Sequence, residues 1–177
     1  PSVSVGNAGQ LGVDLLITKI KPQKFGLVWH SAILPMVGGD PYSSSQAALT
    51  TSAELFYSEQ WKLVIFQIRS PIVQETSQDF MDRLMEWIKQ NSIDSVVILS
   101  GIFDYTRNDS EIAGPPVKFV VSPSFAERCE VLKRLEEDQG VTSDCQSHSV
   151  VVCDASQKPN KISMYGGGIS WKLFNAW

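Results

Sequence analysis

Three glycines near the start of the chain have a spacing that could form a phosphate-binding loop. Gly6, Gly9 and Gly12 follow a short predicted strand with alternating valines and lead into an apolar helical pattern. A dinucleotide-binding loop needs a middle glycine where this chain has alanine, and a Walker loop needs a Lys-Ser or Lys-Thr pair that does not follow here. Asn7 and Gln10 have the spacing of a helix capping box. The pattern therefore favours a strand-to-helix turn with packing glycines over nucleotide binding.

A second set of residues could bind a phosphate where predicted strands end. Ser100 ends the apolar run SVVILSG, and Arg107 lies in the loop after it. A glycine triplet before a predicted helix completes the set: Gly166, Gly167 and Gly168. Because ligands of open α/β sheets bind at strand ends and helix N-termini attract anions, one hypothesis is a small enzyme of the nucleoside phosphorylase or hydrolase kind. The alternative, which we favour, is that Arg107 pairs with a carboxylate beside an Asn-Asp turn.

Catalysis would also need a general base, and the chain has few candidates. His30 and His148 are the two histidines, and each adjoins an apolar run where a hydrogen-bonded structural role is expected. The glycine triplet is similar to the oxyanion loop of some esterases, but no G-x-S-x-G nucleophile motif accompanies it. Motifs for zinc and calcium are missing as well. We therefore expect a protein without catalytic activity, metal or cofactor.

Composition and charge are those of an ordinary globular protein. Of the 177 residues, 43% are hydrophobic and 19% are charged, and 15 basic against 19 acidic side chains leave a net charge of -4. This length predicts a single domain over residues 1–177 with a sizeable core. The lack of a strongly basic stretch argues against binding of nucleic acid.

The cysteines and the apolar runs bear on the cellular compartment. Cys129, Cys145 and Cys153 are an odd number without metal-ligand spacing, so neither a disulfide framework nor a zinc site is predicted. The sequence contains no run of about 18 uncharged apolar residues and no basic-then-apolar leader. We therefore expect no membrane association and a location in the cytoplasm and nucleus.

The elements that must position these residues alternate between helical and strand periods. Helices are predicted at 7–20, 77–90 and 124–140, and strands at 25–30, 52–59, 62–69, 95–101, 117–122 and 148–153. The two runs on either side of residue 60 predict a hairpin, whereas 32–51 reads as loop because of its composition. The alternation predicts an α/β fold with a mostly parallel sheet and helices on both faces.

Two apolar patterns lead to more detailed expectations about burial. The first helix is expected to be largely buried, through an apolar face of Leu11, Leu15 and Leu16 that is widened by Val13, Ile17 and Ile20. The run 95–101 is continuously apolar, which predicts a strand that is buried on both faces at the centre of the sheet.

Further apolar residues occur in segments that are otherwise built like surface loops. They are Leu34, Pro35, Met36, Val37, Tyr42, Phe103 and Tyr105. Methionine and aromatic residues in such places are enriched at protein interfaces. The alternative is that these side chains fold back and cover the edge of the sheet. We predict that segments 33–42 and 103–109, the latter including Arg107, contact protein partners.

Several of these motifs resemble those of the PAC2-type family of proteasome assembly chaperones. VSVGNAGQLGVDLLI, LPMVGGDPY, VVILSG followed by YTRND, and GGGIS occur in the order and at about the spacing found in that family. The resemblance covers nearly the whole chain. It implies a non-catalytic, three-layer relative of the nucleoside-phosphorylase-like α/β fold. In such a fold the architectural residues are Gly6, Asn7, Gly9, Gln10, Gly166, Gly167 and Gly168.

The resemblance also implies a function and its partners. Such proteins pair with proteasome assembly chaperone 1 and bind the α-subunit ring of the proteasome core particle, promoting its assembly without a cofactor. Part of the docking uses a C-terminal tail with a penultimate aromatic residue, where this chain has Ala176. The stretch WKLF at 171–174 resembles a later part of the family. We therefore expect that residues are missing between Ser170 and Trp171 and that the tail lies beyond Trp177.

Overall fold

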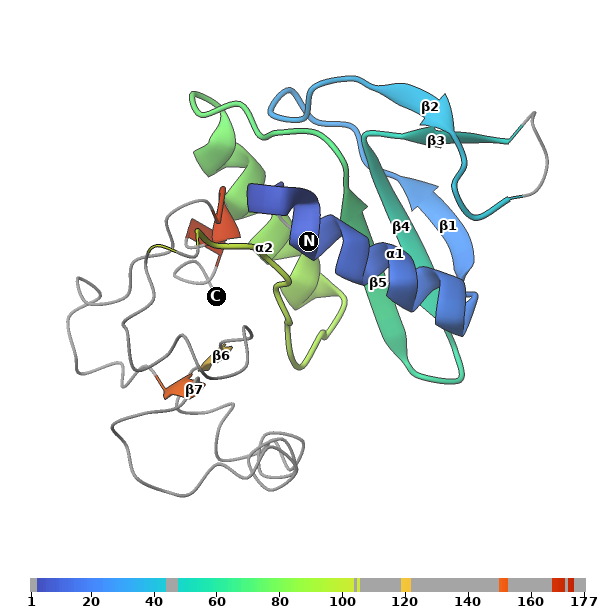
Figure 1. Ribbon diagram of the computed structural model, residues 1–177. Helices are drawn as coiled ribbons and strands as arrows, with labels where there is room; N and C mark the ends of the chain where they lie inside the picture. The colour runs from blue at the N-terminus through green and yellow to red at the C-terminus, as the bar shows by residue number, and fades with distance from the viewer. Residues whose placement is uncertain are drawn as a thin grey trace. The chain divides into compact units, whose positions relative to one another are not determined.

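A computed structural model of the chain describes residues 3–43, 48–103, 105, 119–121, 150–152, 167–170 and 172–173 (Figure 1). The chain divides into two compact units, one of Pro1–Phe103 with Met164–Trp177 and the other of Asp104–Ser163. The single domain over 1–177 stays a prediction.

The first unit is built around a three-stranded antiparallel sheet. β1 (Gln23–Leu27), β4 (Ala53–Ser58) and β5 (Leu63–Ile68) lie side by side in the order β1-β4-β5. α1 (Ala8–Ile20) packs on one face of this sheet and α2 (Ser77–Gln90) on the other (Figure 1). The predicted α/β class and the helices on both faces of a sheet are therefore present.

The β4–β5 hairpin contributes to two separate cores. The core under α1 consists of Val13, Ile17, Phe56 and Ile65. The core under α2 includes Ala53, Ile68, Phe80, Met81, Met85 and Ile88. Neighbouring residues of a strand point to opposite faces, so a strand with apolar residues at both odd and even positions can bury side chains under each helix.

The predicted apolar face of α1 is buried only in part. Leu11 and Leu15 are 58% and 64% exposed, whereas Gly9, Val13 and Ile17 are buried. The three buried residues are four apart and therefore lie on one helical face. The prediction is confirmed for Val13 and Ile17 and is wrong for Leu11 and Leu15, because the side with Gly9 is the one that can approach the rest of the unit closely.

The chain before α1 forms a tight turn where a strand was predicted. η1 (Val5–Asn7) is a single 3-10 turn, and Gly6 and Asn7 have positive φ angles of 65° and 52°. Asn7 precedes α1, but its side chain makes no capping hydrogen bond, so the predicted capping box is wrong. A capping side chain needs an extended backbone, which this left-handed residue lacks. Gln10 is instead buried, and its carbonyl oxygen accepts a hydrogen bond from Gln67 Nε2 at 3.4 Å.

Two glycines allow the start of α1 to lie directly against residues 99–101. A Cβ atom on Gly9 would lie 2.3 Å from the carbonyl oxygen of Leu99, and one on Gly101 would lie 2.4 Å from that of Val5. Side chains do not come so close to backbone, so only glycine fits at these two positions. The amide of Gly101 also donates a hydrogen bond to Ser4 Oγ at 2.7 Å. Gly9, the second glycine of the N-terminal motif, thus packs against the backbone of Leu99 and Ser100.

Part of the predicted loop at 32–51 forms a second, small sheet. β2 (Val37–Gly39) pairs antiparallel with β3 (Leu49–Thr51), and one residue separates β3 from β4. Figure 1 shows this hairpin at one end of the main sheet. Each strand has three residues, which is too short for an alternating pattern to be recognised in the sequence.

A buried carboxylate attaches this small sheet to the main one. Glu54 is only 1% exposed, and it accepts hydrogen bonds from Thr50 Oγ1 at 2.8 Å and from the amide of Thr51 at 3.0 Å. Lys24 Nζ lies 3.0 Å from the same carboxylate and 3.7 Å from that of Asp40. A buried charge needs such partners, and Lys24 together with Thr50 and Thr51 supplies them where the two sheets meet.

The prediction of a mostly parallel sheet is wrong for the first unit. Both strand pairs of its main sheet are antiparallel, as the short connection between β4 and β5 requires. The run 95–101 forms no strand, and Val97 is 73% exposed while Val96 and Ile98 contact the core under α2. Burial on both faces is therefore wrong as well. The nucleoside-phosphorylase-like architecture stays a prediction.

The second unit contains one described pair of strands. β6 (Phe119–Val121) and β7 (Val150–Val152) pair in parallel, and each lies within a predicted strand. The predicted helix at 124–140, the three cysteines and His148 lie outside the described residues.

Replacing Gly9 by alanine should destabilise the fold, whereas the same change at Gly12 should not. At Gly9 the new methyl group would meet the Leu99 carbonyl oxygen at 2.3 Å, but at Gly12 it would meet only the side-chain tip of Leu99 at 3.4 Å. Overpacking costs about 1–3 kcal/mol, and alanine is favoured over glycine in a helix by about 1 kcal/mol. Urea unfolding followed by tryptophan fluorescence should show a loss for Gly9→Ala alone. Equal stability of both variants would contradict the packing role of Gly9.

Candidate functional site

The predicted interface residues at 34–37 lie on the surface. Leu34, Met36 and Val37 are 45%, 50% and 72% exposed, and Pro35 is exposed as well. Ile33, directly before them, is buried. We refer to residues 34–37 as the apolar segment. Adjacent exposed apolar residues of this kind are typical of a surface that binds another protein.

Ser52 holds the apolar segment in place through its backbone. The Ser52 hydroxyl accepts a hydrogen bond from the amide of Met36 and donates one to the carbonyl oxygen of Leu34, both at 2.6 Å. Ser52 is only 6% exposed and lies between β3 and β4. Because both bonds use backbone atoms, they fix the segment and leave its apolar side chains on the surface.

β3 adds one exposed apolar residue that the sequence prediction missed. Leu49 is 61% exposed and is paired with Gly39 of β2, two residues beyond the end of the apolar segment. Thr50, next to it, is 6% exposed. A strand of three residues is too short for an alternating pattern to stand out in a loop-like composition, so the sequence offered no clear signal for it.

Tyr42, which was also predicted to contact a partner, is built into a polar network. Its hydroxyl donates a hydrogen bond to the Asp14 carboxylate and accepts one from Arg69 Nη2 at 2.7 Å. Its ring packs edge-on against Phe56, with 5.7 Å between the ring centroids. Burial, together with the hydrogen bond to Asp14, raises the pKa of the Tyr42 hydroxyl above its ordinary value. Tyr42 therefore attaches the turn after β2 to α1 and the sheet, and its contact with a partner stays a prediction.

Asp14 is the common acceptor of this network. Its carboxylate accepts hydrogen bonds from Gln67 Nε2 of β5 at 2.5 Å and from Nη2 of Arg69, directly after β5, at 2.9 Å. The Arg69 and Asp14 side chains are 20% and 26% exposed, so water screens their attraction only in part. Burial by itself would lower the pKa of Arg69, but the hydrogen bond to Asp14 and the neighbouring acidic groups outweigh it and raise that pKa.

The structure brings two members of the predicted anion site together, in an arrangement unsuited to an anion. The Ser100 hydroxyl donates a hydrogen bond to the carbonyl oxygen of Gly167 at 3.1 Å. This bond uses the hydroxyl proton, and a carbonyl oxygen repels an anion. Gly168 has a positive φ of 60°, which suits a glycine turn. Arg107 and Gly166 lie outside the described residues.

His30 is held by hydrogen bonds on both ring nitrogens. Nδ1 accepts a bond from the amide of Ala32 at 3.0 Å, and Nε2 lies 3.0 Å from Asp79 Oδ2. The ring also packs edge-on against Phe80, with 5.4 Å between centroids. The hydrogen bond from Arg83 is the main cause of a lowered pKa of the Asp79 carboxyl, and the bond with His30 acts in the same direction. His30 thus has the structural role that its position in the sequence predicted.

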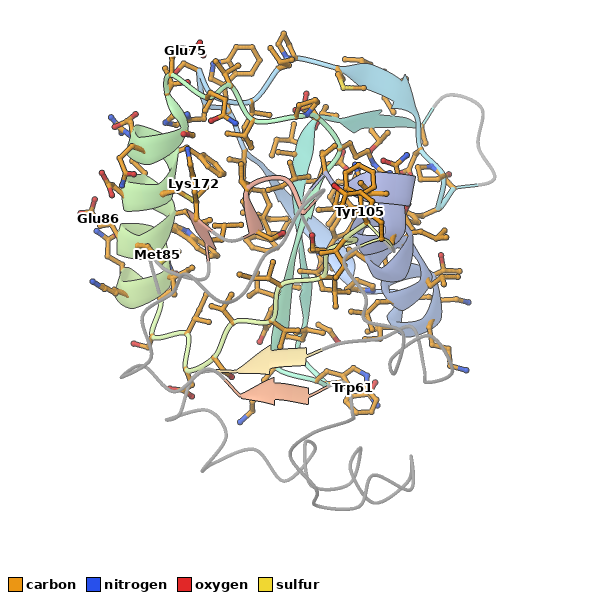
Figure 2. All side chains as sticks on the ribbon, turned by 60° about the vertical axis from the view of Figure 1, so that its left-hand side comes forward. Trp61, Glu75, Met85, Glu86, Tyr105 and Lys172 are labelled. Carbon is orange, nitrogen blue, oxygen red and sulfur yellow. The ribbon has the colours of Figure 1, made fainter. Side chains whose placement is uncertain are left out.

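The remaining predicted contact residues are divided between the two units. Phe103 ends the first stretch of one unit and is 40% exposed. Tyr105, whose side chain is labelled in Figure 2, belongs to the other unit. It is 73% exposed. The interface role of segment 103–109 stays a prediction.

Two other kinds of site are absent from the described part of the chain. Its His, Cys, Asp and Glu side chains form no group of three that could hold a metal ion. Among the helices described, none combines the length and the apolar character needed to cross a membrane.

Replacing Asp14 by alanine should destabilise the protein, because Arg69, Gln67 and Tyr42 would lose their common acceptor. Hydrogen bonds to a charged group contribute about 1.5–3 kcal/mol, so we expect a loss of about that size in urea unfolding. Asp82→Ala is the matched control, since Asp82 is exposed on α2 and accepts one bond, from Gln78. It should change stability much less. A double-mutant cycle with Arg69→Met should show that the two effects are coupled. Similar losses for Asp14→Ala and Asp82→Ala would rule out a central role for the network.

The raised pKa of Tyr42 predicts how its contribution to stability depends on pH. A tyrosine of the unfolded chain ionises near pH 10, whereas Tyr42 in the folded protein resists ionisation until a higher pH. Its stabilising effect is therefore complete below about pH 10 and falls as the pH rises above that value. The difference in unfolding free energy between the unmodified chain and Tyr42→Phe should be constant from pH 8 to 9.5 and decrease by pH 11. A difference that does not change over this range would contradict the network geometry.

Comparison with known proteins gives one consistent family. The model of the PAC2 family matches residues 1–153. Proteins named proteasome assembly chaperone 2 are similar: that of Danio rerio is 39% identical over 98% of this chain, that of Bos taurus 36% over 99%, and that of Homo sapiens 30% over 99%. The chain spans 66% of the length of each of these three relatives. Because the family model matches well over half of it, this chain belongs to the PAC2 family.

Proposed function

We propose that this chain is a proteasome assembly chaperone that pairs with proteasome assembly chaperone 1 and binds the α-subunit ring of the core particle. In this proposal it acts in the cytoplasm and nucleus, promotes assembly of the particle and needs no cofactor. The observation that carries the proposal is the name shared by relatives that match 98% and 99% of the chain. That name describes a chaperone, which is a non-enzymatic role.

The surface of the first unit supports a role in binding proteins. The apolar segment and Leu49 expose large apolar side chains on β2, β3 and the residues just before them. Ser52 and Glu54 hold these elements through polar contacts beneath them. A surface of this kind can bury apolar area against a partner while its own backbone moves little, which lowers the entropic cost of association.

Two polar residues that were considered for catalysis support the same role. Both nitrogens of His30 and the hydroxyl proton of Ser100 already have hydrogen-bond partners within the chain. We therefore place the function of this chain at its interfaces. Family membership is also our reason to propose the nucleoside-phosphorylase-like three-layer architecture for the complete fold.

An affinity pull-down from a eukaryotic lysate, with the tagged chain as bait and mass spectrometry of the bound proteins, tests the proposal. We expect assembly chaperone 1 and proteasome α subunits to be recovered, with few β subunits. Val37→Asp should lower recovery of at least one of these partners several-fold, because it puts a charge into the apolar segment. Gln78→Asp adds the same charge at an exposed position of α2 and should leave recovery unchanged.

Thermal unfolding of each bait establishes that it is folded before the comparison is made. Recovery of neither partner by the folded, unmodified chain would overturn the proposed function. Equal recovery by Val37→Asp and Gln78→Asp would instead remove the apolar segment from the interface while leaving the function intact.

A further inference from the structure

Two neighbouring glycines of β2 have no need to be glycine that the described part of the chain accounts for. Gly38 and Gly39 lie in a strand, and neither has a positive φ angle. No atom of the described residues lies within 4 Å of the place that a Cβ atom on either residue would take. Glycine weakens a strand, because its backbone loses more freedom on folding than that of any other residue. A glycine in a strand often marks a place that another molecule approaches closely.

The pairing of β2 with β3 places the two glycines on opposite faces of the small sheet. Gly38 lies opposite Thr50, and Gly39 lies opposite Leu49. Thr50 is 6% exposed and its hydroxyl binds the buried Glu54, so the face with Gly38 and Thr50 is turned toward the main sheet. Side chains of neighbouring strand residues point to opposite faces, so Gly39 and Leu49 belong to the outer face.

On this outer face, Gly39 leaves an open position beside two exposed apolar side chains. Val37, two residues earlier on the same face, is 72% exposed, and Leu49, on the facing strand, is 61% exposed. The amide of Asp40 donates a hydrogen bond to the carbonyl oxygen of Ala48 at 2.9 Å. Gly39 and Leu49 are therefore the non-bonded pair next to it, the kind of pair in which the facing side chains are closest. We refer to Val37, Gly39 and Leu49 as the Gly39 site.

Polar contacts hold the Gly39 site in place on both sides. The amide of Met36, directly before it, donates a hydrogen bond to Ser52 Oγ at 2.6 Å. Asp40, directly after it, uses both carboxylate oxygens within the chain. One accepts a hydrogen bond from the amide of Tyr42 at 2.9 Å, and the other lies 3.7 Å from Lys24 Nζ. The side chains of the site itself are apolar, so a group that binds there gains mainly by burying apolar surface.

We propose that a protein partner inserts a large apolar side chain, such as leucine, methionine or phenylalanine, at Gly39 between Val37 and Leu49. The inserted side chain covers the bare backbone of Gly39 and removes apolar surface of both neighbours from water. A larger residue at position 39 would occupy this place itself, which explains why a glycine stands there. The inference rests on the proposed function and deepens it by naming the group that the partner supplies.

The surroundings of the Gly39 site favour a protein over a small molecule. Two side chains border the open position, whereas small-molecule sites enclose most of the surface of their ligand. A side chain on a protein surface brings further contacts with it, and the adjoining apolar segment exposes Leu34 and Met36 to receive them. A few apolar anchors that fit between such residues provide most of the binding energy of many protein interfaces.

Filling the open position tests the inference in the pull-down from a eukaryotic lysate. Gly39→Val should lower the recovery of at least one partner several-fold, because the new side chain takes the place of the inserted one. Gly38→Val is the matched control, since it adds the same side chain to the neighbouring glycine, which has equally open surroundings on the other face. It should leave recovery unchanged.

Thermal unfolding separates an effect on binding from an effect on folding. Both valine variants should unfold at the same temperature as the unmodified chain or at a higher one, because valine favours a strand more than glycine does. A loss of recovery by Gly39→Val then cannot come from unfolding. Gly39→Ala adds a smaller group and should give an intermediate loss, and it decides the question if the valine variant does not fold.

Photo-cross-linking identifies the inserted group. With the photo-reactive residue benzoylphenylalanine in place of Leu49, irradiation and mass spectrometry should find the chain attached at or next to a large apolar residue of the partner. The same residue in place of Leu11, which is exposed on α1, should not attach to that part of the partner.

Three results would overturn the inference while leaving the proposed function intact. They are undiminished recovery of both partners by folded Gly39→Val, equal losses for Gly38→Val and Gly39→Val, and cross-links from position 49 that reach only charged segments of the partner. In each of them the unmodified chain still recovers its partners. Recovery of neither partner by the folded, unmodified chain would instead overturn the proposed function, and this inference with it.

Discussion

The first unit depends on one set of contacts, those around the Asp14 carboxylate. This carboxylate accepts hydrogen bonds from Gln67, Arg69 and Tyr42. It therefore connects α1 with the C-terminal end of β5 and with the turn after β2. The apolar core under α1 holds the helix on the sheet, but hydrophobic burial has no preferred direction. Directional bonds in a partly buried site define the position of the helix more narrowly. Because Tyr42 follows β2 closely, the same contacts limit where the small sheet can lie.

Apolar surface in this unit is supported by polar residues beneath it. Ser52 binds the backbone of the apolar segment, and Glu54 with Lys24 attaches β3 to the main sheet. Without such contacts, exposed apolar side chains would lower their free energy by collapsing onto the protein's own core. The proposed binding of protein partners depends on those side chains staying outside. The design differs from that of an enzyme, in which polar side chains are kept available for a substrate.

Structural features that depend on residues close together in the sequence could be predicted, whereas those that depend on distant residues could not. α2 has the predicted bounds, 77–90, because its apolar stripe and its polar face repeat clearly along one continuous segment. The β4–β5 hairpin follows equally directly from two β-rich runs and a short polar turn. The burial of Gly9 in place of Leu11 and Leu15, and the role of Tyr42, could not be predicted in this way. Both depend on residues far away in the sequence, namely Leu99 for Gly9 and Arg69 for Tyr42.

The sequence by itself therefore determined the α/β class, the main local elements and, through several motifs, the resemblance to the PAC2 family. These features depend on residues that are close together along the chain or on motif spacing. Tertiary structure decided that the main sheet is antiparallel, that Leu11 and Leu15 are exposed, and that Ser100 donates to a carbonyl oxygen. The physical reason is that burial and hydrogen bonding are satisfied for the whole unit at once. A residue whose local pattern predicts one role takes another when a distant backbone or side chain is its better partner.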